Sequence, residues 1–135
     1  MRAEAVALLQ KSHVFLKKAE GMLAQWPDEA GRAAYLAGLH AAQAFIIEKT
    51  GRLAKTHKGV QRELARLTKD ESEFGPESRA FLGRAYNLKA IADYETGPGS
   101  EVSRAQAMDA IEGARNFVAA LSLLMEASLV NPRTP

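Results

Sequence analysis

The sequence of 135 residues contains no cysteine, which excludes a disulfide framework, a thiolate metal site and a cysteine nucleophile. It also lacks a glycine-rich phosphate loop and a serine nucleophile signature. No Glu-x-x-His pair occurs, so the ligand set of a di-iron bundle is missing. The three histidines, His13, His40 and His57, share no ligand spacing. The sequence therefore predicts neither a metal site nor a cofactor.

Long apolar runs are also missing. The longest one, from Phe117 to Met125, is too short to span a bilayer and is followed by Glu126. The N-terminal segment contains Glu4 and only a brief apolar run, which does not fit a secretion signal. We expect a cytoplasmic protein that does not act at a membrane.

Apolar residues recur at helical spacing along the chain, and no stretch alternates as a strand would. Helices are expected over about 2–26, 29–50, 57–68, 76–94 and from Ser103 onward. Thr56 is expected to cap the third helix, Ser103 and Gln106 to form a capping box, and Gly51 to end the second helix. These elements predict an all-α fold, an antiparallel four-helix bundle with an additional short helix. We expect one helical domain over 1–130 and a flexible tail over 131–135.

Side-chain pattern predicts which faces are buried. The second helix is dense in alanine and glycine, which allow close approach of neighbouring helices, so we expect it to be central. Val6 and Leu16 are predicted to face the core from the first helix, Phe81 from the fourth, and Met108 and Ile111 from the fifth.

Positive charge is concentrated between positions 49 and 69, although the formal net charge is only +2. Such a stretch is either a solvated helix face or an electrostatic contact surface for RNA or an acidic partner. The charge order alone does not separate these interpretations. The residues of the stretch are Lys49, Arg52, Lys55, Lys58, Arg62, Arg66 and Lys69, opposed only by Glu63.

The expected fourth helix ends on Asp93, Tyr94 and Glu95. Carboxylates are disfavoured at the carbonyl end of a helix, where the helix dipole is negative. Lys89 precedes Asp93 by four residues, a spacing that allows an ion pair worth about 0.3–0.5 kcal/mol at an exposed site. A salt bridge alone does not account for the tyrosine and the second acid, so a functional role for Lys89, Asp93 and Tyr94 is the alternative.

Four segments, in this order, resemble the HEPN family, in its branch of small stand-alone prokaryotic proteins: "AAYLAGLHAAQAFIIEKTG", "KTHKGV", "RAYNLKAIADYE" and "VSRAQAMDAIEGARNFVAAL". The resemblance implies a bundle of four or five helices that usually forms a homodimer. It also implies a minimal nucleotidyltransferase as the antitoxin partner in a toxin–antitoxin pair. Active family members are metal-independent endoribonucleases.

The resemblance suggests candidate catalytic residues. Lys89 stands where this branch commonly has an arginine, followed after three residues by Asp93 and Tyr94. His57 lies in "KTHKG", which is similar to a recurring Ser/Thr-His-x-Gly segment of the branch; its alternative role is to cap the third helix or bond the loop. Candidate contacts to RNA or a partner are Arg52, Lys55, Lys58, Arg62 and Arg84.

Three interpretations remain open from the sequence. The first is a toxin-like HEPN protein that cleaves RNA at a cleft between two subunits. The second is a non-catalytic module that binds a nucleotide or a protein partner, which the lysine at position 89 and the lack of a histidine after His57 favour. A structural dimer without a site is a third interpretation.

Overall fold

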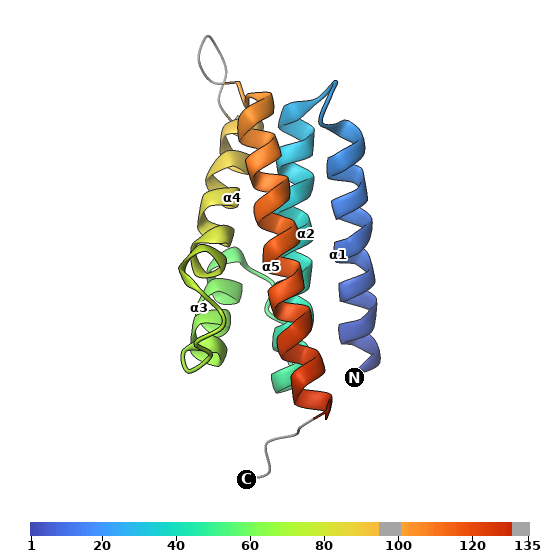
Figure 1. Ribbon diagram of the computed structural model, residues 1–135, viewed down its shortest axis with the longest axis vertical. Coiled ribbons are helices and arrows are strands. Elements are labelled where there is room, and N and C mark those ends of the chain that lie inside the picture. Colours follow the sequence, from blue (N-terminus) through green and yellow to red (C-terminus); the bar gives the residue numbers. More distant parts are fainter. Residues whose placement is uncertain (95–100, 131–135) are drawn as a thin grey trace.

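The computed structural model describes residues 1–94 and 101–130, which form an antiparallel α-helical bundle (Figure 1). This confirms the predicted fold class. The short helix α3 lies beside the lower part of α4. The predicted tail at 131–135 lies outside the described residues. The helices are α1 (Ala3–Met22), α2 (Pro27–Thr50), α3 (His57–Thr68), α4 (Pro76–Tyr94) and α5 (Arg104–Val130).

Local hydrogen bonds fix where the helices begin and end, as the sequence predicts. The Thr56 hydroxyl accepts from the backbone N–H of Gly59 at 3.0 Å, which caps α3. Ser103 and Gln106 bond reciprocally at 2.9 and 3.0 Å and form the capping box of α5. Gly51 ends α2 with a φ of 74°, a left-handed conformation that glycine adopts without strain.

Helix α2 is the centre of the bundle, and it packs against each of the other four helices. Its buried face consists largely of alanine and glycine, which confirms the prediction from composition. Gly38 shows how close the contact is, because a Cβ built there would lie 2.3 Å from Cε2 of Phe81 on α4. The Phe81 ring also contacts the ring of Phe117 on α5, with centroids 4.9 Å apart. Phe81 thus joins three helices.

Two predicted core positions are wrong. Val6 is 39% exposed and Met108 is 52% exposed. On α1 the buried stripe contains the small residues Ala5 and Ser12, because they face the alanine-rich surface of α2. The Ser12 hydroxyl donates to the carbonyl oxygen of Ala37 at 2.7 Å. Because this bond satisfies the hydroxyl, the polar side chain is buried at a position that a pattern of apolar residues does not predict.

The first helix also ends earlier than predicted, at Met22 instead of Trp26. Pro27 begins α2, where its fixed φ and missing N–H suit the first turn. The intervening residues therefore form the turn between the two helices.

Arg79 fixes the position of α3 relative to α4. Its guanidinium, on the first part of α4, donates to the carbonyl oxygens of Thr68 at 2.7 Å and Glu71 at 3.0 Å. The Thr68 carbonyl ends α3 and the Glu71 carbonyl lies in the turn that follows it, so Arg79 ties this connection to α4. Val60 and Leu64 bury the inner face of α3, so the start of this helix is held next to α2.

We predict that Gly38→Ala lowers the free energy of unfolding by about 1–3 kcal/mol, because the added methyl group displaces the buried ring of Phe81. Gly21→Ala is the matched control, since a Cβ at position 21 on α1 meets nothing within 4 Å. That change should stabilise the protein by about 0.5–1 kcal/mol through helix propensity. Urea unfolding measures both. Equal effects at the two positions would contradict the packing described.

Candidate functional site

His57 is the first residue of α3, and its imidazole meets two tyrosines from other helices. Its Nδ1 lies 2.8 Å from the hydroxyl oxygen of Tyr35 on α2. Its ring stacks on that of Tyr86 on α4, with centroids 4.0 Å apart and planes 17° from parallel. Tyr35 and Tyr86 meet edge to face at 5.6 Å. Three helices therefore position one imidazole.

From the sequence, the alternative structural role of His57 was to cap α3 or to bond the loop. The geometry corrects this prediction. The hydroxyl of Thr56, not His57, caps α3, and the bonded partner of His57 is a side chain of α2 rather than the loop. The segment that resembles the family's Ser/Thr-His-x-Gly therefore brings a histidine against α4, the helix that bears Lys89.

Burial sets the protonation of this cluster. It raises the pKa of Tyr35 to about 12, with a smaller contribution from Tyr86. Burial lowers the pKa of His57, and the nearby charge of Lys89 lowers it further. Both groups are therefore neutral near pH 7. Because the Tyr35 hydroxyl can donate or accept, the bond admits both neutral tautomers of His57, and Nε2 either carries the proton or accepts one.

Asp93, at the end of α4, is bound by two cations. Lys89 on the same helix donates to Oδ2 at 2.7 Å, and the Arg32 Nε on α2 donates to Oδ1 at 2.7 Å. Arg32 is bonded to Glu29 as well. The hydrogen bond from Lys89 is the main cause that lowers the pKa of Asp93; burial opposes it and Arg32 adds to it. The predicted Lys89–Asp93 ion pair is thus present, and Arg32 extends it across two helices.

Lys89 connects the ionic and aromatic groups. Its Nζ lies 5.9 Å from the ring centroid of Tyr86 and 5.9 Å from that of Tyr94. Tyr94 is 77% exposed, so its ring is open to a ligand. We refer to this contiguous group as the His57–Lys89 site. Its members are Arg32, Tyr35, His57, Tyr86, Lys89, Asp93 and Tyr94.

The predicted basic contacts fall in different places. Arg52, Lys55 and Arg62 line a pocket of about 400 Å³ beside the start of α3, together with the carboxylate of Glu63. Lys58 is on α3 but does not line this pocket. The remaining predicted contact, Arg84, lies in a groove between α4 and α5.

Sequence reasoning missed Arg32. It is the only cation between Asp28 and Lys49, in a helix whose interior is otherwise almost free of charge. A single charged residue in such a segment needs a partner if it is partly buried, and this was the available signal. Tyr35 follows three residues later, so both side chains project from the same side of α2.

The family model described as HEPN domain matches residues 5–124. The chain belongs to the HEPN family. In this HEPN chain, the matched range includes every residue of the His57–Lys89 site.

A solved structure has a similar architecture. The crystal structure of TT1696 from Thermus thermophilus aligns with a TM-score of 0.76 at 19% identity, over 90% of this chain and 98% of that chain. The likeness supports the HEPN-like all-α fold. No curated protein matches the sequence.

Residues 1–94 and 101–130 contain neither a cluster of metal-binding side chains nor a helix that could cross a membrane. Within these ranges, no three or more of the His, Asp and Glu residues are grouped as a metal ion would require. No helix there has the length and apolar character of a bilayer span.

We predict that Lys89→Gln raises the pKa of His57, because the substitution removes a positive charge that disfavours the imidazolium. His40 is an internal control, since its pKa is lowered by burial and by Lys11 rather than by Lys89. NMR titration of the imidazole protons measures both values. An unchanged pKa for His57 would contradict the proximity of these residues.

The same pKa shift has a consequence for stability. A histidine whose folded-state pKa is lowered binds fewer protons in the folded state than in the unfolded state. Its contribution to stability is complete above the unfolded pKa of about 6.5 and is lost as the pH falls below it. We therefore predict that wild-type protein loses more stability than His57→Gln between pH 7.5 and about pH 5.5, measured by urea unfolding.

Proposed function

We propose that this HEPN protein is the toxin-like component of a toxin–antitoxin pair and cleaves RNA without a metal ion. The observation that carries the proposal is the position of the His57 imidazole, which is bonded to Tyr35 and stacked on Tyr86, the ring that Lys89 also approaches. A neutral imidazole can take up a proton as a general base, and a nearby cation offsets charge on a phosphate.

The proposed reaction uses the ribose 2′-hydroxyl as nucleophile. Nε2 of His57 removes the 2′-hydroxyl proton, the 2′ oxygen attacks the adjacent phosphorus, and the bond from phosphorus to the 5′ oxygen breaks. The 5′ oxygen takes a proton from water as it leaves, and His57 then returns its proton to the solvent. The products are a 2′,3′-cyclic phosphate and a free 5′-hydroxyl. Lys89 stabilises the phosphate charge. An ammonium has three donors, so Lys89 can keep its bond to Asp93 while it donates to phosphate.

The other members of the site position these groups. Tyr35 orients His57 through the 2.8 Å bond, while Arg32 and Asp93 fix the ammonium of Lys89. The exposed ring of Tyr94 offers a stacking surface for an unpaired base. These supports make the chemistry possible within one protomer, and the proposed homodimer would carry two such sites along a shared cleft.

RNA would reach the site across the basic pocket beside α3. Arg52, Lys55 and Arg62 converge there, and such cations bind the phosphate backbone with little sequence preference. His57 begins the same helix that Arg62 belongs to. The pocket and the imidazole are therefore separated by less than two turns of α3 along the chain.

The second candidate function is a non-catalytic module that binds a nucleotide or a minimal nucleotidyltransferase, the proposed antitoxin. The ion pairs of the site favour this function, because both cations already have carboxylate partners. Arg32 is bonded to Glu29 and to Asp93, and Lys89 is bonded to Asp93. Lysine also grips a phosphate less specifically than the bidentate arginine common in this branch. On this proposal Tyr94 and the basic pocket are contact surfaces.

We predict that purified protein cleaves labelled single-stranded RNA in the presence of EDTA, and that His57→Ala lowers the cleavage rate by about 10²–10⁴-fold. Lys89→Ala should lower it as well, because phosphate charge is no longer offset. His13→Ala is the matched control, since His13 is an exposed histidine on α1. Cleavage that persists unchanged in both site variants, or no cleavage by wild type, would reject the catalytic proposal and leave the binding module.

The RNA path is tested separately by affinity. We predict that the double variant Arg52→Gln, Arg62→Gln weakens RNA binding and lowers the salt slope of the affinity by about one per residue removed. Lys17→Gln and Lys18→Gln on α1 form the control pair, because both lysines are exposed outside the pocket. Fluorescence anisotropy over a range of salt concentrations measures the effect. Equal losses in the two double variants would exclude a specific role for the pocket.

A further inference from the structure

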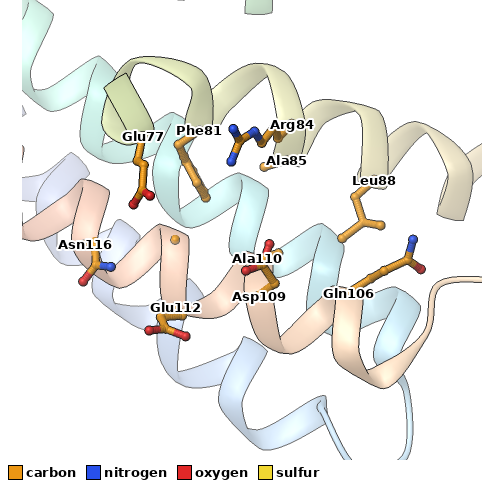
Figure 2. Close-up of a pocket in the computed structure, with 11 residues that line it drawn as sticks. Glu77, Phe81, Arg84, Ala85, Leu88, Gln106, Asp109, Ala110, Glu112 and Asn116 are labelled. Carbon is orange, nitrogen blue, oxygen red and sulfur yellow. The ribbon is translucent and has the colours of Figure 1, made fainter. Parts of the chain in front are cut away.

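A groove of about 330 Å³ runs between α4 and α5, and the proposed RNA chemistry does not use it (Figure 2). None of the residues that line it belongs to the His57–Lys89 site. On α4 it extends from Glu77 to Leu88, and on α5 from Gln106 to Asn116. The helices run in opposite directions, so Glu77 lies near Asn116 and Leu88 near Gln106.

The floor of the groove is apolar and well supported. Phe81 is packed from below, since its ring lies against Gly38 of α2 and Phe117 of α5. Gly113 lets α5 approach this ring closely, since a Cβ there would lie 3.0 Å from Cδ1 of Phe81. Phe81 and Ala85 are therefore buried beneath the floor. The apolar surface that the groove offers comes mainly from Leu88 and Ala110, which are only partly buried.

The rim of the groove is acidic. Glu77, Asp109 and Glu112 face it together with one cation, Arg84, a formal local charge of −2. Within residues 1–94 and 101–130, none of these four side chains forms a salt bridge or a side-chain hydrogen bond. The whole chain has a net charge of +2. The local charge is thus opposite in sign to that of the protein and is available to a ligand.

The length and chemistry of the groove identify its occupant. Leu88 follows Glu77 by eleven positions, which at a rise of 1.5 Å per residue gives about 16 Å, or about three helical turns. An apolar floor with charged rims fits an amphipathic helix that places apolar side chains at i, i+4 and i+7 into the groove. We propose that this groove binds a cationic amphipathic helix of a protein partner.

The geometry specifies the partner's helix further. Its lysines or arginines would lie opposite the carboxylates of Glu77, Asp109 and Glu112, and an uncharged or acidic residue would lie opposite Arg84. Its apolar side chains would rest on Leu88 and Ala110, the partly buried residues of the floor. Such charge matching selects the partner and its orientation. RNA is disfavoured in this groove because three carboxylates repel its phosphates.

A direct test uses a fluorescein-labelled synthetic helix of about 14 residues, with leucines at i, i+4 and i+7, lysines on the flanks and alanine elsewhere. We expect saturable binding to the full-length protein by anisotropy. Chemical shift changes in ¹⁵N spectra should be concentrated at 77–88 and 106–116. A matched peptide with glutamate in place of every lysine should not bind.

Reversing the charge of the groove tests whether its carboxylates bind the peptide. The variant Asp109→Lys, Glu112→Lys should weaken binding of the cationic peptide by about tenfold or more and gain affinity for the anionic peptide. The control Glu4→Lys, Glu126→Lys reverses two exposed carboxylates elsewhere and should leave both affinities unchanged. Circular dichroism verifies that each variant folds.

Three results would overturn the proposal. The first is wild-type protein that binds both peptides equally or neither, and the second is equal weakening by the groove and control variants. The third is self-association of the protein that Ala110→Arg abolishes, measured by light scattering, because the occupant would then be a second copy of this chain.

Discussion

Two side chains one turn apart on α2, Arg32 and Tyr35, hold the rest of the site in place. Arg32 binds the carboxylate of Asp93 at the end of α4, and Tyr35 binds the imidazole of His57 at the start of α3. Residues three apart on a helix project from the same side. Because α2 is the central helix of the bundle, its spacing sets the distance between the groups that α3 and α4 contribute.

This arrangement explains the acidic end of α4. A carboxylate there is unfavourable for the helix dipole, but Asp93 is stabilised by cations from two helices, and its lowered pKa reflects the same contacts. On α4, Lys89 alone supplies a cation to this carboxylate. Arg32 supplies a guanidinium to the same corner from α2, so the corner keeps two cations although α4 provides only one.

Much of the fold could be predicted from the sequence because it depends on local interactions. The boundaries of α3 and α4 follow from Thr56 and Pro76, and the central position of α2 follows from its alanines and glycines. The Lys89–Asp93 pair followed from helical spacing. The exposed Val6 was mispredicted because the burial of α1 depends on the shape of the facing helix rather than on hydrophobicity.

The contact of His57 with Tyr35 could not be predicted, since it joins residues from two helices and depends on how those helices cross. The role of Arg32 was missed for the same reason, because its partner Asp93 is 61 residues away in the sequence. Pairing of this kind is determined by packing, which a single sequence does not reveal. The composition of the site was therefore only partly predictable: three of its four residues on α4, Lys89, Asp93 and Tyr94, were predicted as candidates, whereas Tyr86 was not.

The site exists only if the imidazole of His57 lies between α2 and α4, and NMR tests this most directly. With the rings stacked at 4.0 Å, we predict strong NOEs between the ring protons of His57 and those of Tyr86. Weaker NOEs should connect His57 with the ring of Tyr35. The absence of NOEs from His57 to both tyrosines, in a folded protein with assigned rings, would contradict the site.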